Sequence, residues 1–187
     1  GSSHFQTKLA MRLLCVGAFN GTKNQHALLE NLGALNLNAE VIFPGDGKTL
    51  ATAKEFAESL PDSCAVRFKG RVQRDQAIEH MLEADISISL SKGEGLPIAV
   101  LESMYAGCFL ILSKIPPHEE VAPPPKRCKI VDLTSSTDIS AALNYCEEHL
   151  EEIRSQRKLS EDYAIQYFGM ENMLNTYYDT YLSLLQP

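Results

Sequence analysis

The chain has 187 residues, 44% of them hydrophobic, and a formal net charge of -7 at neutral pH. This length suits one domain that can bury a substantial core. The acidic balance argues against a general nucleic-acid binder, because no basic stripe is available to neutralise phosphates.

Strands alternate with helices along the chain. Short apolar runs predict strands at residues 12–19, 40–43, 66–69, 86–90, 108–112 and 129–131. Apolar residues at helical spacing predict helices at 24–35, 48–60, 73–84, 97–107, 136–155 and 160–185. The proline-rich stretch 115–126 is interpreted as a long loop within the domain. The alternation indicates right-handed βαβ units, and therefore an α/β fold with a Rossmann-like, doubly wound parallel sheet.

The five cysteines are scattered and form no Cys-x-x-Cys pair. Such a set indicates reduced core thiols in a cytoplasmic protein. We find no signal peptide and no apolar run of transmembrane length. The opening Gly-Ser-Ser-His is typical of a tag remnant. We therefore expect residues 1–8 to be a tag remnant or linker and residues 9–187 to form one domain.

Residues 91–107 place two carboxylates around one junction between a loop and a helix. Glu94 lies between two glycines, after the predicted strand 86–90 and just before the predicted helix 97–107. Open α/β sheets bind ligands at the carboxyl ends of their strands, and the N–H groups that begin a helix favour phosphate. An acid that only complements the helix dipole would occupy the same position.

The predicted helix 97–107 begins at a proline and ends at a glycine, which suits both residues. Its apolar residues Ile98, Leu101 and Tyr105 recur at helical spacing and are expected to face the core. Glu102 would then lie at the edge of this apolar stripe, where an ionised group is rarely found without a partner. A surface acid on a helix that packs differently is the alternative.

The loop after the first predicted strand is a second candidate site. Gly17 and Gly21 allow close approach of a ligand to the backbone, and Lys23 precedes the next helix. An anion there would meet an ammonium and the N–H groups of a helix N-terminus. A glycine-rich turn with only a structural role would look the same. The spacing fits neither a P-loop nor a Gly-x-Gly-x-x-Gly dinucleotide fingerprint.

The order Glu-Gly-Leu-Pro, Leu-Glu-Ser-Met and Ala-Gly over residues 94–107 resembles the Glu-x7-Glu segment of the GT4 family, retaining glycosyltransferases of the GT-B fold. The resemblance implies that Glu94 is the catalytic-site residue that contacts the donor sugar. It also implies that Glu102 binds the ribose hydroxyls of the nucleotide. The backbone at Gly95 and Leu96 would then approach the diphosphate and the sugar.

Other segments extend this resemblance over residues 13–184. Gly17 and Lys23 match the family's loop that grips the donor diphosphate, but Ala18 stands where an arginine is common. Arg71 corresponds to a position that reaches the base or the phosphate, with a solvated surface arginine as the alternative. The segment 43–47, Phe-Pro-Gly-Asp-Gly, is similar to the end of the family's second strand, or is an ordinary tight turn.

Two further matches lie in the second half of the chain. The segment 115–121 resembles a loop that ends in Pro-Glu-Ile near the donor site, with Glu120 as its acid. The aromatic-rich residues 163–185 resemble the closing helices of the family, which cross back over a partner domain. Aromatic residues at such spacing more often belong to a core than to a ligand site.

The resemblance covers only the C-terminal, donor-binding domain of a GT-B enzyme. It implies that the chain binds a UDP- or GDP-linked hexose and needs a missing N-terminal GT-B domain to transfer the sugar. The acceptor would be a glycan or a lipid-linked sugar, in glycan or cell-surface polysaccharide biosynthesis. The missing domain would supply any attachment to the inner face of a membrane. We expect the isolated chain to bind the nucleotide sugar and to transfer nothing.

No metal or other cofactor is expected, because no Asp-x-Asp motif appears and the histidines lack metal-ligand spacing. Two other classes of function stay open. A non-catalytic binding or regulatory module of the same fold would tolerate Ala18. A receiver- or flavodoxin-like domain would leave Glu94 and Glu102 unexplained, and the acidic cluster it needs after the first strand is absent.

Overall fold

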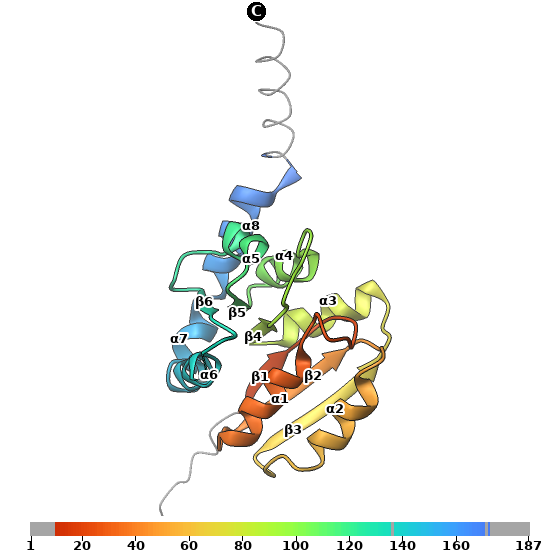
Figure 1. Ribbon diagram of the computed structural model, residues 1–187. Coiled ribbons are helices and arrows are strands. Elements are labelled where there is room, and N and C mark those ends of the chain that lie inside the picture. Colours follow the sequence, from red (N-terminus) through yellow and green to blue (C-terminus); the bar gives the residue numbers. More distant parts are fainter. Residues whose placement is uncertain (1–9, 136, 171, 173–187) are drawn as a thin grey trace, which may run out of the picture.

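Six parallel strands form the centre of the computed structural model, which describes residues 10–135, 137–170 and 172 (Figure 1). Their order across the sheet is β3-β2-β1-β4-β5-β6, and neighbouring strands pair in parallel. The strands are β1 (Met11–Leu14), β2 (Ala39–Pro44), β3 (Cys64–Gly70), β4 (Ile86–Ser89), β5 (Phe109–Ser113) and β6 (Cys128–Val131). This order confirms the predicted Rossmann-like, doubly wound α/β fold.

Helices cover both faces of the sheet (Figure 1). They are α1 (Gln25–Ala34), α2 (Leu50–Ala57), α3 (Arg74–Glu83), α4 (Ile98–Tyr105), α5 (Pro116–Val121), α6 (Asp138–Glu148), α7 (Leu150–Ser155) and α8 (Arg157–Phe168). Side chains of α1, α6 and α7 bury one apolar core against the strands, and side chains of α3, α4 and α8 bury a second core on the opposite face. None of the helices in the described residues is long and apolar enough to cross a membrane.

Four of the predicted segments differ from the structure. The first strand ends at Leu14, so residues 15–19 belong to the following loop. The segment 115–126 is not wholly a loop, because it contains α5, whose prolines occupy the first turn, where no backbone N–H is needed. The predicted helix 136–155 is divided at His149, whose backbone leaves the helical conformation. The predicted last helix begins earlier, at Arg157, and its part beyond residue 172 lies outside the described residues.

The predicted inward face of α4 is wrong at two of its three residues, because only Leu101 packs against the core. Ile98 and Tyr105 are 56% and 39% exposed, whereas Val100, Ser103 and Met104 are buried. The helix is apolar on more than one side, so the spacing of apolar residues alone does not select the face that packs. Packing against β4 does select it, because the buried Ser87 donates a hydrogen bond to Ser103 across 2.8 Å.

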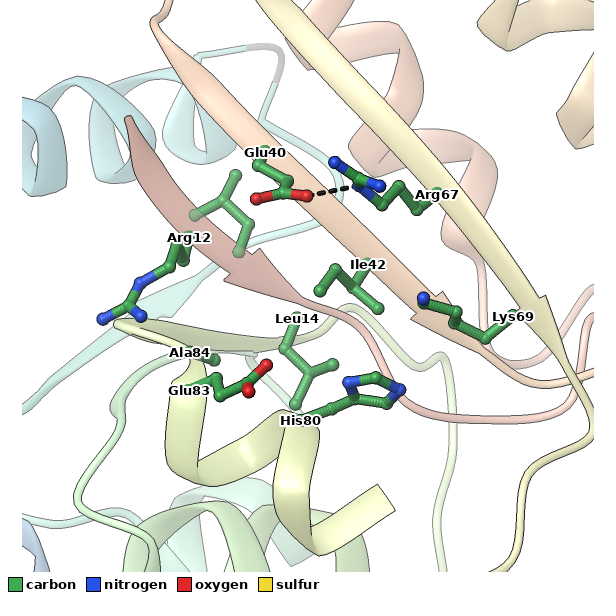
Figure 2. Close-up of a pocket in the computed structure, with 10 residues that line it drawn as sticks. Arg12, Leu14, Glu40, Ile42, Arg67, Lys69, His80, Glu83 and Ala84 are labelled. Atoms are coloured by element: carbon green, nitrogen blue, oxygen red, sulfur yellow. Dashed lines mark hydrogen bonds and ion pairs between the residues drawn. The ribbon is translucent and has the colours of Figure 1, made fainter. Parts of the chain in front are cut away.

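The half of the sheet that contains β2 and β3 has a charged face beside the end of α3. The β3 side chains alternate, with Val66 and Phe68 packed against the core and Arg67 exposed on the other side. Figure 2 shows Arg67 paired with Glu40 above the end of α3, around a hollow of about 200 Å³. Acidic and basic side chains are mixed there, and the hollow lies on the face of the sheet. It is therefore separate from the carboxyl edge of the strands.

Buried ionic and polar contacts tie the C-terminal helices to the sheet. The carboxylate of Asp85, which precedes β4, accepts hydrogen bonds from Arg154 on α7 at 2.9 and 3.1 Å. It also accepts bonds from the backbone and the guanidinium of Arg12. The buried Arg127 donates to Ser160 and to the carbonyls of Ile153 and Gly107. These contacts hold α7 and α8 in place and leave the carboxyl edge of the strands to the loops.

Candidate functional site

Three loops gather at the carboxyl edge of the sheet, because parallel strands all end at the same edge. They follow β1, β2 and β4, whose positions at the middle of the sheet are neighbouring. Between β1 and β4 the strand order reverses, and this switch point is where open α/β sheets bind ligands. The predicted site residues lie in these loops, except Arg71, which follows β3, and Glu102, which lies on α4.

The loops after β1 and β2 touch through their backbones. Gly17 N–H donates to the carbonyl of Pro44 at 3.1 Å, and Phe19 N–H donates to that of Asp46 at 2.9 Å. A Cβ on Gly45 would lie 1.9 Å from the Gly17 oxygen. The Gly-Asp-Gly segment is therefore more than a tight turn, since its glycines allow one loop to lie against the other.

Two polar side chains shape the loop after β1. The buried Gln25 donates from Nε2 to the carbonyls of Ala18 at 3.0 Å and Gly17 at 3.3 Å. The side-chain oxygen of Asn20 accepts the N–H groups of Thr22 at 3.0 Å and Lys23 at 2.8 Å. Neither Asn20 nor Gln25 was singled out from the sequence. Their part in the site depends on which backbone groups the fold brings to them.

Lys23 and Glu94 meet between the loops after β1 and β4, with 2.5 Å between Nζ and Oε1. The Lys92 N–H donates to the Thr22 carbonyl at 2.8 Å and joins the same two loops. Glu94 also accepts a hydrogen bond of 2.6 Å from the hydroxyl of Ser91. Burial raises the pKa of Glu94, but the hydrogen bonds from Lys23 and Ser91 outweigh it and hold this pKa below its usual range. Glu94 is therefore an ionised carboxylate beside an ammonium.

Two adjoining pockets open at this edge. The larger, of about 550 Å³, is bordered by the loops after β1, β2 and β3, with Arg71 and Arg74 at its side. The smaller, of about 190 Å³, is bordered by Lys23, Glu94 and the start of α4. Val16 lines both pockets, so they are neighbours. The larger pocket offers backbone groups and guanidinium groups, and the smaller offers the ion pair.

The structure brings most of the predicted site residues to these pockets. Gly17 and Arg71 line the larger one, while Lys23, Glu94 and Leu96 line the smaller one. Gly95 lies in the same loop, between Glu94 and Leu96.

Glu102 lines neither of these two pockets. Its Oε1 accepts from the guanidinium of Arg74, at 2.7 Å from Nη2 and 3.0 Å from Nε. Arg74 itself lines the larger pocket, so Glu102 lies next to that pocket behind an arginine. The partner expected for a carboxylate at this position is thus Arg74, a residue that the sequence did not single out.

The loop after β5 contributes a residue that the sequence analysis also missed. His118 on α5 is fully buried and contacts the serines at which β4 and β5 end. Glu120, the acid suggested for this loop, is exposed. A helix of six residues gives too little periodicity to show which side chain turns inward. Within the described residues, no group of three His, Cys, Asp or Glu side chains is placed to hold a metal ion.

Comparison with protein families gives a match over residues 7–162 to the model described as "Glycosyl transferases group 1". The chain belongs to this family. The match covers the three loops of the site and all six strands. A search of curated proteins by sequence finds no match.

Solved glycosyltransferases share the fold at low sequence identity. The catalytic domain of cholesterol-alpha-glucosyltransferase from Helicobacter pylori matches with a TM-score of 0.74 at 18% identity, over 85% of this chain and 99% of that one. Anabaena HepE, solved with UDP and glucose, matches with a TM-score of 0.76 at 18% identity, over 93% of this chain and 48% of its own. WaaG, a glycosyltransferase involved in lipopolysaccharide biosynthesis, matches with a TM-score of 0.72 at 21% identity. The match covers 83% of this chain and 42% of WaaG.

The matches show that the fold is one half of a GT-B glycosyltransferase, the C-terminal half. The chain spans about half the length of HepE and less than half that of WaaG.

Proposed function

We propose that this chain is the donor-binding half of a retaining glycosyltransferase that moves a hexose from a nucleoside-diphosphate sugar to an acceptor. The observation that carries the proposal is the ion pair between Lys23 and Glu94 at the junction of two pockets, in a domain of the glycosyl transferases group 1 family. Where a diphosphate joins a sugar, a cation can contact a phosphate oxygen and a neighbouring carboxylate can accept hydrogen bonds from the sugar hydroxyls.

The two pockets divide a nucleotide sugar in a way that its chemistry supports. The larger pocket has room for a nucleoside, with Arg71 and the backbone of the Gly-Asp-Gly segment beside it. Lys23 has three N–H donors, so it can contact a phosphate oxygen while it stays near Glu94. Glu94 is ionised and accepts hydrogen bonds, which suits the hydroxyl groups of a sugar.

Glu102 would hold the ribose of the nucleotide. Both contacts from Arg74 go to Oε1, which leaves Oε2 for a ribose hydroxyl. Arg74 would then fix the carboxylate at the border of the larger pocket, where the ribose joins the base.

Transfer would need the other half of a GT-B enzyme. The relatives HepE and WaaG are about twice as long as the segment that this chain matches. An acceptor has to be held within reacting distance of the sugar, and orientation of this kind lowers a barrier by up to roughly 7–11 kcal/mol. The acceptor would be a glycan or a lipid-linked sugar, in glycan or cell-surface polysaccharide biosynthesis.

A thermal-shift panel of UDP-, GDP- and ADP-linked hexoses tests the proposal directly. We expect one nucleotide sugar to raise the melting temperature, since a ligand that binds only the folded state stabilises it. Glu94→Gln should reduce the shift given by the nucleotide sugar more than the shift given by the bare nucleotide. A chain that no nucleotide or nucleotide sugar stabilises would contradict the proposal.

A non-catalytic binding module is the second candidate function. It is favoured by Ala18, which provides no cation where the family commonly has an arginine, and whose carbonyl is instead held by Gln25. The two candidates differ in turnover by the natural full-length protein. Binding without transfer to any acceptor would favour the module.

A further inference from the structure

A buried histidine lies beneath the loop that carries Glu94. His118 on α5 is 0% exposed, although Glu119 and Glu120 next to it are exposed. Its Nδ1 lies 3.1 Å from both the carbonyl oxygen and the hydroxyl of Ser113, the last residue of β5. Its Nε2 lies 3.3 Å from the hydroxyl of Ser89, the last residue of β4. The ring therefore links the ends of two neighbouring strands.

The hydrogen bonds around Ser113 determine which ring nitrogen carries the proton. The Ser113 hydroxyl donates its single proton to the carbonyl of Ser91 at 2.5 Å. A carbonyl oxygen accepts only, so Nδ1 has to be the donor toward Ser113. Burial lowers the pKa of His118, which favours the neutral ring. In that ring Nε2 is an acceptor, and the Ser89 hydroxyl donates to it.

Ser91 connects this arrangement to Glu94. The buried Ser91 receives the Ser113 hydroxyl at its carbonyl, and its own hydroxyl lies 3.4 Å from that of Ser89. The Ser91 hydroxyl donates to Glu94 Oε1 at 2.6 Å. The Ser89 hydroxyl gives its one proton to His118 and has none left for Ser91, so the link from His118 to Ser91 runs through Ser113. We propose that His118 is a positioning residue, which fixes the orientation of Glu94 toward the donor sugar through Ser113 and Ser91.

This role rests on the proposed function, because it assumes that Glu94 faces a sugar. The proposal also predicts that His118 affects binding of the sugar and not binding of the nucleotide. Ser89 and Glu94 line the smaller pocket, whereas the larger pocket is bordered by the loops after β1, β2 and β3. Loss of the His118 network should therefore weaken the hold on the sugar and leave the hold on the nucleotide nearly unchanged.

Calorimetry with UDP and UDP-glucose measures the hold on the nucleotide and on the sugar separately. If the thermal-shift panel shows that the chain prefers guanosine, GDP and GDP-mannose replace them. His118→Phe removes the ring N–H that donates to Ser113. Ser113→Ala removes the hydroxyl that joins His118 to Ser91, with little change in volume and at a residue that lines neither pocket, so it guards against a histidine variant that fails to fold. We expect both variants to lose about tenfold in affinity for the nucleotide sugar. Affinity for the bare nucleotide should change by less than about twofold.

Ser103→Ala is the matched control. It also removes a hydroxyl from a buried serine pair, but on the helix α4 and outside the His118 network. It should leave the ratio of the two affinities unchanged. The double variant of His118 and Ser113 should lose no more than either single variant, because both remove the same link.

The failures of the two proposals are distinguishable. A wild-type chain that binds neither nucleotides nor nucleotide sugars would overturn the proposed function and this inference with it. A wild-type chain that binds both, with an unchanged affinity ratio in the two variants, would overturn the inference alone. Parallel losses for nucleotide and nucleotide sugar, together with a lowered melting temperature, would assign His118 to fold stability instead.

Discussion

Lys23 and Glu94 form an ion pair that the contacts between two loops hold in place. Their side chains are 31% and 11% exposed, so the pair is partly shielded from water. Shielding strengthens the attraction and also costs solvation of both charges. The loop contacts that place the two residues side by side therefore matter as much as the charges themselves. A diphosphate would add a second anion to a lysine that already faces one.

At this scale, Lys23→Ala tests the diphosphate interaction. Loss of a charged hydrogen bond should weaken UDP binding by about 1.5–3 kcal/mol and leave uridine binding nearly unchanged. Lys92→Ala removes an exposed lysine from the neighbouring loop, while its backbone contact to Thr22 remains. This control should have little effect on either ligand. Equal losses for UDP and uridine in calorimetry would show that Lys23 acts through the fold.

Glu102→Gln tests the ribose assignment. A carboxylate accepts from both ribose hydroxyls more strongly than an amide does. Affinity should fall by about 1–3 kcal/mol, and it should fall for uridine as well as for UDP, because both contain the ribose. Unchanged affinity for both ligands in calorimetry would contradict the ribose assignment.

At the scale of elements, the site depends on how closely its loops approach. Gly47 has a φ of +152°, and a Cβ there would lie 2.3 Å from the Phe19 carbonyl oxygen. Phe19 in turn donates to Asp46 and accepts from Thr49, so the loops after β1 and β2 form one unit. A side chain at position 47 would push this unit apart.

Gly47→Ala should therefore destabilise the domain by roughly 2 kcal/mol and weaken nucleotide binding. Gly21→Ala is the matched control in the loop after β1, because a Cβ there meets nothing within 4 Å. A glycine replaced at a compatible position usually leaves stability unchanged or raises it by about 0.4–1 kcal/mol. Urea unfolding of both variants measures the difference, and similar stabilities would contradict the packing argument.

Asp85 makes the stability of the domain depend on pH in the acidic range. Burial raises its pKa, but hydrogen bonds from Arg154 and Arg12 outweigh burial and hold the pKa below its usual range. A lowered folded-state pKa stabilises the protein above the unfolded value of about 3.9, and this stability is lost as the pH falls through the lower folded value. The β4 end of the sheet and α7 should therefore loosen together below about pH 4.

Asp85→Asn should lower the free energy of unfolding by about 2 kcal/mol at neutral pH, since it removes the charged hydrogen bonds that Arg154 and Arg12 make to a fully buried carboxylate. The variant should also lose less further stability than the wild type as the pH falls below about 4. Asp62→Asn removes an exposed acid and serves as the control. Unfolding curves that fall in parallel for wild type and Asp85→Asn would show that Asp85 is not the group responsible.

At the scale of the whole molecule, the chain presents an open edge of loops, where we propose that the donor binds. The fold matches the C-terminal half of longer glycosyltransferases such as HepE and WaaG. We therefore expect the isolated chain to bind the nucleotide sugar and to form no glycoside, while the natural full-length protein turns it over. A labelled nucleotide sugar with candidate acceptors measures both. Transfer by the isolated chain would contradict the half-enzyme proposal.

The sequence by itself determined the fold class and the family, and it predicted where the candidate site lies. Alternating apolar runs and helical spacing depend only on local geometry, so they predicted six strands in the right places. The Glu-x7-Glu segment identified the loop before α4 and the family. Local patterns also have clear limits. Two apolar sides on α4 gave no reason to prefer Val100 over Ile98, and prolines concealed the short helix α5.

Only the tertiary structure decided which side chains meet. Lys23 and Glu94 are 71 positions apart, and Arg74 and Glu102 are 28 apart, so no local period relates them. His118 lies on a six-residue helix and becomes part of the site only because β4 and β5 are neighbours in the sheet. Contacts of this kind depend on strand order and on the burial of polar groups that need partners. The physical reason is that the chain specifies its elements locally, whereas packing of those elements brings distant charges together.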